Sequence, residues 1–207
     1  MAIELRSLVE ASTTAVVTSE LQHGVVGERS MLPELAAAAR PAIAGAALLC
    51  TAARAAGAQV IHCTAQRRAD GLGSNLNARL FHAVRKSEVA LLPGSHEVEV
   101  VPELGPVQGD LVLSRLHGLD PMAGTDLDPV LRNLGVRTVV VAGVSVNIAI
   151  TNLVMDAVNR GYQVVVPRDA VAGVPADYAD AVIDNTLAML ATVTTTEAVI
   201  AAWKERP

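Results

Sequence analysis

Short apolar runs along the chain are separated by polar and glycine-rich stretches. Four of these runs are rich in β-branched residues and are bounded by polar residues or glycine: 15–18, 59–63, 136–142 and 163–166. Runs of this length without polar alternation are typical of parallel strands that are buried on both faces. Two weaker candidates lie at 111–114 and 191–195. The pattern therefore predicts a mainly parallel sheet of six strands.

Helical patterns fill the intervals between the predicted strands. The Ala-rich stretch 33–56 has Pro41 placed to open its longer helical part and Gly57 placed to end it. Further helices are expected at 126–133, 146–159, 176–190 and 197–203. Strand and helix alternate, and no linker-like stretch divides the sequence. The pattern thus predicts one α/β domain over residues 1–207, a three-layer α/β/α structure around a doubly wound, Rossmann-like sheet.

The segment 68–109 is the least regular part of the chain. It is rich in glycine, asparagine and proline, and it is much longer than an ordinary connection between a strand and a helix. Long excursions of this kind are usually functional. We expect the segment to form either a lid over a site or a contact between subunits of a homo-oligomer.

Composition and charge narrow the classes of partner. Hydrophobic residues make up 51% of the chain and aromatic residues only 2%, so the core must consist of small aliphatic side chains. The formal net charge is -5 and basic residues cluster only at 67–68 and 85–86, which argues against nucleic acid as a partner. Residues 1–12 lack the apolar segment of a signal peptide, and no uninterrupted apolar run reaches the roughly 18 residues of a membrane span. We therefore expect a cytoplasmic protein that does not bind membranes.

Polar residues that follow the predicted strands are the first candidates for a site. In open parallel sheets, ligands bind beyond the carboxyl ends of the strands, where loops and helix N-termini converge. The candidates come from four strand ends: Glu20 and Gln22; Gln66 and Arg67; Arg115 and His117; Ser145, Asn147 and Ala149. We expect these residues to surround a small-molecule ligand.

Three of these strand ends resemble landmark positions of the isochorismatase-like (cysteine hydrolase) family, and the agreement in order and spacing runs from about residue 14 to 196. The sequence TAVVTSELQ resembles the family's first strand followed by Asp-Met-Gln, with Glu20 at the acid/base aspartate. The sequence DLVLSR is similar to the strand that carries the family's lysine, with Arg115 at that position. The sequence GVSVNIA resembles the family's Gly-Val-x-Thr-x-x-Cys stretch, with Ala149 where the nucleophilic cysteine would be.

The resemblance implies the isochorismatase-like fold, and its chemistry depends on these three positions. Cysteine-using members are amidases in which a thiolate attacks a carbonyl, but an alanine cannot attack. A guanidinium stays charged, so Arg115 can hold an anion but cannot exchange protons. Isochorismatases proper need a general acid and water instead, and they carry a small residue at the cysteine position and Thr-Ala-Gln after the second strand, as at 64–66 here. An acid at Glu20 would have to hold a proton in the complex with substrate.

Two hypotheses from different classes follow. In the first, the protein is a hydrolase without a cysteine nucleophile: Glu20 is the acid/base, and Arg115 and Gln66 anchor a small anionic substrate. The N–H groups of Ser145 and Ala149 would polarise the reacting group, and the resemblance implies a cis peptide between Val144 and Ser145. In the second, the protein is an inactive pseudoenzyme that binds a small molecule or a protein in the retained pocket. Further candidates for ligand contact are Gln22, Arg67, His117 and Asn147.

Structural interpretations of the same residues remain open. Glu20 and Arg115 could form an ion pair, and Ser145 and Asn147 could be helix-capping and turn residues. If the first hypothesis holds, Glu20 and Arg115 should face each other across one pocket at the ends of adjacent strands. Ala149 should line the floor of that pocket.

Cysteine and histidine positions predict neither a disulfide framework nor a metal or cofactor site. Cys50 and Cys63 are too few for a framework, and both are expected to be reduced. His62 and Cys63 close the second strand, where packed core residues are usual, and an apolar strand end should leave the thiol unreactive. The five histidines show no metal-ligand spacing, and the Asp-x-His and further histidines of the nicotinamidase members are missing after Gln66.

Overall fold

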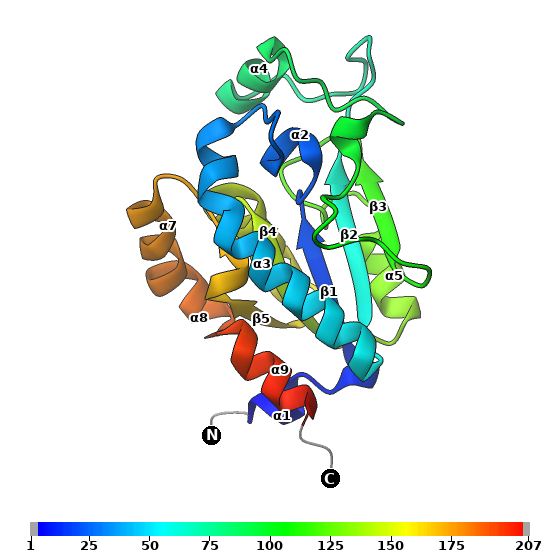
Figure 1. Ribbon diagram of the computed structural model, residues 1–207, viewed down its shortest axis with the longest axis vertical. Coiled ribbons are helices and arrows are strands. Elements are labelled where there is room, and N and C mark those ends of the chain that lie inside the picture. The colour runs from blue at the N-terminus through cyan, green and yellow to red at the C-terminus, as the bar shows by residue number, and fades with distance from the viewer. Residues whose placement is uncertain (1–3, 205–207) are drawn as a thin grey trace.

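A parallel sheet forms the centre of the fold in the computed structural model, which describes residues 4–204 (Figure 1). Its strands are β1 (Thr14–Ser19), β2 (Gln59–Ala65), β3 (Leu111–Arg115), β4 (Thr138–Val144), β5 (Gln163–Pro167), β6 (Val171–Ala172) and β7 (Thr192–Thr194). The order across the sheet is β3-β2-β1-β4-β5-β7, and β6 pairs with β4. The order runs outward in both directions from the pair β1 and β4, so the sheet is doubly wound as predicted.

Helices cover both faces of this sheet. They are α1 (Leu5–Leu8), α2 (His23–Val26), α3 (Pro33–Ala56), α4 (Arg79–Lys86), α5 (Leu127–Asn133), α6 (Thr151–Asn159), α7 (Ala176–Val182), α8 (Ala188–Leu190) and α9 (Thr196–Lys204). Short 3-10 turns lie at Ala11–Thr13, His96–Val98 and Arg168–Ala170, and π-helical turns at Val146–Ile150 and Ile183–Leu187.

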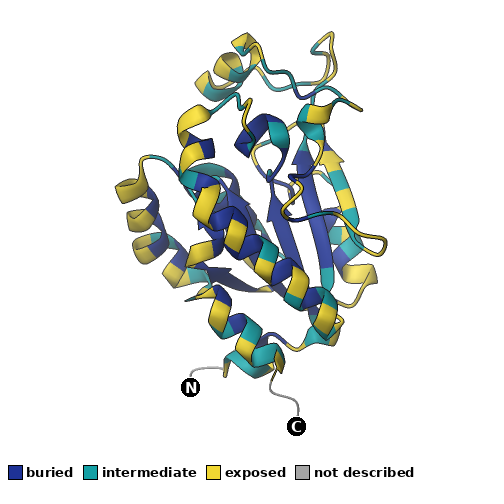
Figure 2. Ribbon diagram, viewed as in Figure 1, coloured by how far each residue is buried: buried dark blue, intermediate teal, exposed yellow. Residues whose placement is uncertain are grey.

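Two apolar clusters, one on each face, make up the core. One contains buried residues of α1, α2, α3 and α9, and the other contains buried residues of α5, α6 and α7. Neighbouring residues of each central strand contribute to opposite clusters: Val16 packs with α3, whereas Ala15 and Val17 pack with the other layer. Figure 2 shows the strands buried between exposed outer helix faces. The predicted three-layer α/β/α fold is confirmed.

The longest helix, α3, crosses the front of the sheet in Figure 1 and illustrates how the ends of helices are set. Pro33 occupies its first turn, and Gly57 ends it at φ 83°, a left-handed conformation that favours glycine. Pro41 lies inside the helix and does not open it, which corrects the prediction from sequence. By length and composition α3 could cross a membrane, but half of its most apolar window is buried within the structure.

Three details of the sheet and its helices differ from the prediction. A seventh strand, β6, has only two residues, and such a short pair leaves no apolar run in the sequence. The strand predicted at 136–142 is β4, two residues further along, because its register with β1 runs from Thr14 opposite Thr138 to Ser19 opposite Gly143. The helix predicted at 146–159 begins with a π-helical turn before α6.

The part of the segment 68–109 that contains α4 lies at the upper end of the view in Figure 1, where α4 stands apart from the two helical layers. The last residues of the segment run back along the sheet, and Gly109 accepts a hydrogen bond from the side chain of Gln59 at the start of β2. None of the residues of α4 is fully buried. The segment returns to the body through Gln22 and Val100, which form an antiparallel bridge next to β1. This placement puts α4 beyond the carboxyl ends of the strands.

Candidate functional site

Gly143 and the turn after β4 form one wall of the site. Gly143 has φ 115°, and a Cβ atom built there would lie 2.2 Å from the carbonyl oxygen of Ser19 on β1, so only glycine fits. The following peptide, Val144–Ser145, is cis, as the resemblance implied. The carbonyl of Ser145 then accepts hydrogen bonds from the N–H groups of Ile148 (3.1 Å) and Ile150 (3.0 Å). The turn brings Ser145, Ile148 and Ala149 to the cavity described below.

Glu20 follows β1 in an unusual backbone conformation. Its φ is 56°, and among residues 4–204 it is the one residue other than glycine with a positive φ. Its N–H donates to the carbonyl of Cys63 (2.9 Å), which holds this conformation against the end of β2. A glutamate in the left-handed region is strained, and such strain is concentrated at functional sites. The turn directs the carboxylate of Glu20 into the cavity.

Arg115, the last residue of β3, forms an ion pair with Glu20 through its Nη2 and the glutamate's Oε1. The side chain of Arg115 is only 7% exposed and that of Glu20 is 18% exposed. Within the described part of the chain, Nε and Nη1 of Arg115 are buried and have no hydrogen-bond partner. Buried guanidinium donors without partners are costly, and an anion that entered the cavity would satisfy them.

The strands that carry this pair are not adjacent, which corrects the expectation from sequence. β2 lies between β1 and β3, with Ala65 opposite Arg115 in register. Two strand spacings separate β1 from β3 by about 10 Å. The pair forms because both side chains are long and Ala65, at the end of β2, is small. Glu20 and Arg115 therefore meet directly instead of facing each other across the pocket.

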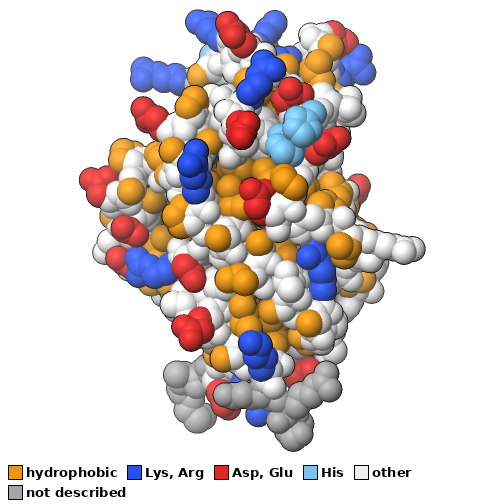
Figure 3. Space-filling model, viewed as in Figure 1, with side chains coloured by type: hydrophobic (Ala, Val, Ile, Leu, Met, Phe, Trp, Pro, Cys, Tyr) orange, Lys and Arg blue, Asp and Glu red, His pale blue; other side chains and the backbone are white. Residues whose placement is uncertain are grey.

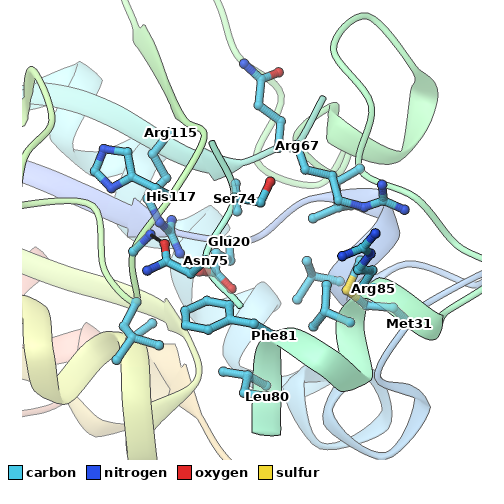
Figure 4. Close-up of a pocket in the computed structure, with 18 of the residues that line it drawn as sticks. Glu20, Met31, Arg67, Ser74, Asn75, Leu80, Phe81, Arg85, Arg115 and His117 are labelled. Carbon is cyan, nitrogen blue, oxygen red and sulfur yellow. Dashed lines mark hydrogen bonds and ion pairs between the residues drawn. The ribbon is translucent and has the colours of Figure 1, made fainter. Parts of the chain in front are cut away.

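A cavity of about 170 Å³ opens beside the Glu20–Arg115 pair (Figure 4). Glu20, Arg115 and Ala149 all line it, so the three strand ends converge as expected. Drug-sized ligands usually occupy roughly 300–1,000 Å³, so this cavity suits a smaller molecule. Three arginines and one glutamate line it, which makes it locally cationic in a chain whose formal net charge is -5.

Comparison with known proteins identifies the family. The model of the Isochorismatase domain matches residues 14–198. The chain belongs to the isochorismatase family of hydrolases. A ureidoacrylate amidohydrolase from Methylorubrum extorquens is 29% identical over 184 residues, which cover 81% of this chain and 73% of that protein. An uncharacterized isochorismatase family protein of Bacillus subtilis is 35% identical over 74 residues, only 36% of this chain and 39% of that protein.

Solved structures of the isochorismatase family share the fold along most of the chain. The crystal structure of a cysteine hydrolase from Pseudomonas syringae pv. phaseolicola superimposes with a TM-score of 0.83 at 27% identity and covers 95% of each chain. The fold and the family predicted from the sequence are therefore confirmed.

Four further residues predicted to contact a ligand line the same cavity of this isochorismatase-family chain. They are Gln66, Arg67, His117 and Ser145. Gln66 is held by its backbone N–H, which donates to the carbonyl of Arg115 (2.9 Å). Its side chain is therefore left available to the cavity.

Gln22, predicted as a ligand contact, is instead structural. Its side chain is fully buried and does not line the cavity. The amide of Gln22 donates from Nε2 to the carbonyl of Ala65 (2.9 Å) and accepts at Oε1 from the N–H of Ala65 (2.7 Å). These two bonds continue the pairing of β1 with β2 beyond the end of the strands, so the side chain has no capacity left for a ligand.

Asn147 also lies outside the cavity wall, contrary to the prediction. Its Oδ1 is buried without a hydrogen-bond partner among the described residues and lies 3.1 Å from the position of a Cβ on Gly173. The π-helical turn that starts at Val146 points Asn147 toward the β6 side, whereas Ile148 and Ala149 face the cavity. Ser145 precedes the turn but makes no side-chain capping bond there.

His62 and Cys63 are packed in the core, as their structural interpretation predicted. Cys63 does not line the cavity, and burial raises the pKa of its thiol to about 12. His62 is fully buried between Thr18, whose Oγ1 lies 2.9 Å from Nδ1, and Asp110, whose Oδ2 lies 3.4 Å from Nε2. Burial lowers the pKa of His62 and outweighs the attraction of Asp110.

Side chains of the segment 68–109 form the outer wall of the cavity and were not among the residues predicted. Ser74, Asn75, Leu80, Phe81 and Arg85 all line it. The Oδ1 of Asn75 accepts a hydrogen bond from the N–H of Gly118 (2.8 Å), which ties the segment to the loop after β3. The apolar residues of α4 recur at helical spacing, and Phe81 is the chain's single phenylalanine. That amphipathic pattern is the feature of the sequence from which the cavity residues of α4 could have been predicted. The lid interpretation of this segment agrees with the contacts.

Across residues 4–204, no group of three or more histidine, cysteine, aspartate or glutamate side chains is placed to hold a metal ion. Apart from Glu20, the polar side chains at the cavity are arginines, amides, serine hydroxyls and His117. This set suits an organic anion better than a cation.

Proposed function

We propose that this chain is a hydrolase of small carboxylates that uses water, not a cysteine, as the nucleophile. The observation that carries the proposal is the ion pair of Glu20 and Arg115 at the cavity, in which two buried guanidinium nitrogens of Arg115 have no partner. A substrate carboxylate that bound to these nitrogens would lie beside Glu20. The ureidoacrylate in the name of the amidohydrolase relative is itself a small carboxylate.

The proposed role of Glu20 follows from the charges at this end of the cavity. In the free protein, the carboxylate of Glu20 is paired with the guanidinium of Arg115. When a substrate carboxylate also binds the guanidinium of Arg115, two carboxylates contact the same cation. The second negative charge favours the protonated form of Glu20. Substrate binding would therefore supply the proton that a general acid needs.

The proposed hydrolysis needs no reactant other than the substrate and water. Glu20 donates its proton to the nitrogen or oxygen of the leaving group as the bond from carbon to that atom breaks. A water molecule adds to the same carbon, and the proton that it releases returns to Glu20. Arg115 stays charged throughout and holds the carboxylate of the substrate. The N–H groups of Ser145 and Ala149, at the turn after β4, would stabilise negative charge on the reacting group.

The alternative, a binding protein without turnover, is favoured by a different observation. No cysteine lines the cavity, and the position that the resemblance gives to the nucleophile is Ala149. The same anion contacts would serve a binding protein. Turnover is therefore the property that separates the two functions.

The test uses the purified full chain and a panel of small carboxylates with a hydrolysable C–N or C–O bond, beginning with ureidoacrylate. Product formation and binding are measured for the wild type, for Glu20→Gln and for Arg115→Gln. Glu103→Gln, an exposed glutamate away from the cavity, is the matched control. We expect Glu20→Gln to lose hydrolysis by a factor of about 100 or more while it still binds. Arg115→Gln should weaken binding.

Two results would contradict the proposal. If Glu20→Gln hydrolysed at the wild-type rate, Glu20 would not be the acid/base. If the wild type bound several carboxylates of the panel and hydrolysed none, the protein would be a binding module, and the alternative function would stand.

A further inference from the structure

The arginines of the cavity lie in two separate places (Figure 4). At one end of the cavity, Arg115 lies beside Glu20. In the same view, Arg67 and Arg85 lie on the opposite side, and they come from the loop after β2 and from α4. One ligand between the two groups would meet positive charge at both of its ends.

The outer arginines have no structural carboxylate to pair with. Across residues 4–204, no carboxylate oxygen lies within 4.0 Å of the nitrogens of Arg67 or Arg85. The neighbouring Arg68 differs, because its guanidinium binds Asp70 at 2.6 Å. Figure 3 shows lysine and arginine side chains at this end of the molecule among aspartate and glutamate side chains. An anionic group that bound Arg67 or Arg85 would therefore displace no carboxylate from these two arginines.

The lining between the two groups of arginines is mainly apolar: Leu80 and Phe81 lie there in Figure 4, together with the polar Ser74 and Asn75. Leu35, Val84, Leu91 and Ile148 also line the cavity. Such side chains favour contact with a hydrocarbon or other weakly polar group and offer no hydrogen bonds to it. The cavity thus has Arg115 at one end, Arg67 and Arg85 at the other, and a mainly apolar lining between them.

We infer that the cavity selects a small molecule with an acidic group at each end of an apolar middle. Arg115 binds the inner carboxylate, and Arg67 and Arg85 bind the outer acidic group. Arg85 is then a specificity-determining residue carried by the lid helix α4. The inference rests on the proposed function only in assigning the inner carboxylate to Arg115.

The gain in affinity that each outer arginine provides depends on how exposed that arginine is. Arg85 is exposed and Arg67 is partly buried, so each pair with a carboxylate contributes about 0.5 to 1 kcal/mol, or roughly a threefold to fivefold gain in affinity. Two such pairs predict a gain of about tenfold for a dianion of suitable length over the matching monoanion. The gain should fall as salt screens the exposed pairs.

The experiment measures binding by isothermal titration calorimetry with α,ω-dicarboxylates from succinate to suberate. Each is compared with the monocarboxylate of the same carbon number. We expect at least one dicarboxylate to bind the wild type about tenfold more tightly than its monocarboxylate. Arg67→Gln and Arg85→Gln should each remove about threefold of this advantage, so each should weaken dicarboxylate binding more than monocarboxylate binding. Arg68→Gln and Arg79→Gln are the matched controls, because both residues are exposed, carry the same charge and do not line the cavity.

Two results would overturn the inference. One is equal binding of every dicarboxylate and its monocarboxylate to the wild type. The other is a loss in Arg79→Gln as large as that in Arg85→Gln, which would reduce the effect to general charge. Failure of the proposed function looks different: dicarboxylates would be selected, but no substrate would be hydrolysed. Hydrolysis of monocarboxylates without such selection would refute only the inference.

Discussion

The substitution Glu20→Gln should make the protein bind small carboxylates more tightly. In the wild type, a carboxylate that reaches Arg115 must share it with Glu20, and the two negative charges repel each other. At a separation of about 5 Å and an effective dielectric constant near 20, this repulsion amounts to roughly 3 kcal/mol. Glutamine keeps the shape of the side chain and a carbonyl oxygen for Arg115, but it removes the repulsion. Because the side chain of Glu20 is 18% exposed, solvent will screen part of it.

We therefore expect Glu20→Gln to lower the Kd of monocarboxylates such as propionate by about tenfold, or 1.4 kcal/mol, at neutral pH. Isothermal titration calorimetry gives the Kd, and titration in two buffers of different ionisation enthalpy gives the protons taken up. The wild type should take up protons on binding, since a second carboxylate favours protonation of Glu20, and the variant should not. Glu103→Gln should behave as the wild type does in both measurements.

The same substitution should destabilise the free protein. Removing one partner of a fully buried ion pair costs about 3–5 kcal/mol, and the partial exposure of Glu20 reduces this to about 1–3 kcal/mol. For a chain of this size, each kcal/mol lowers the Tm by roughly 2–4 °C. A saturating monocarboxylate should recover the loss, because it binds only the folded state. If the variant bound carboxylates no more tightly than the wild type, the reasoning about shared charge at Arg115 would be refuted.

Two further predictions concern buried groups away from the cavity. Because the folded state lowers the pKa of His62, this histidine gains a proton only in the unfolded chain as the pH falls below about 6.5. The free energy of unfolding measured by urea titration should therefore drop between pH 7.5 and pH 5.5. The drop should vanish in His62→Gln but persist in His82→Gln, which changes an exposed histidine and serves as the control. Burial raises the pKa of Cys50 and of Cys63 to about 12, so iodoacetamide at pH 7.5 should alkylate neither thiol until the chain unfolds. Rapid alkylation of Cys63 in the folded protein, with loss of ligand binding, would contradict its place in the core.

The sheet could be predicted from sequence because burial on both faces leaves an unmistakable pattern. β1, β2, β4 and β5 are apolar and β-branched along nearly their whole length, so each gives a recognisable run. The two-residue β6 leaves no run of its own. The limits of β4 depend on its register with β1, which places Gly143 opposite Ser19. That information belongs to the pair of strands and cannot be read from either strand alone.

The candidate site was predicted where its residues stand at strand ends, and not where local turns decide their direction. Glu20, Arg115 and Ala149 converge because parallel strands bring their carboxyl ends to one edge. Gln22 is only two residues from Glu20, but the positive φ of Glu20 turns the chain so that the amide meets β2. Asn147 faces away because a π-helical turn changes the angular spacing of side chains from that of an α-helix.

The lid could be predicted as a segment but not residue by residue. The length and the glycine content of 68–109 indicate an excursion, but Phe81 and Arg85 share their cavity with residues more than fifty positions away in sequence, such as Glu20 and Ile148. No local rule connects α4 to the turn after β4. Only the folded chain places them on the same cavity.

The three departures from the family pattern that the resemblance assigns to this chain fit one another physically. A titratable lysine and a thiol are useful together, because the cation helps to form a thiolate. With Ala149 in the wall there is no thiolate to form, and a permanently charged arginine is then the better anchor for an anion, since its planar fork holds a carboxylate by two hydrogen bonds. The charge of an arginine at the end of β3 must also be neutralised by a carboxylate on β1, about two strand spacings away. The side chain of glutamate at position 20 is longer than that of the family's aspartate, and it contacts Arg115 directly. Restoring only one of the three, such as Ala149→Cys alone, would therefore leave a thiol beside a glutamate whose carboxylate is already paired with Arg115.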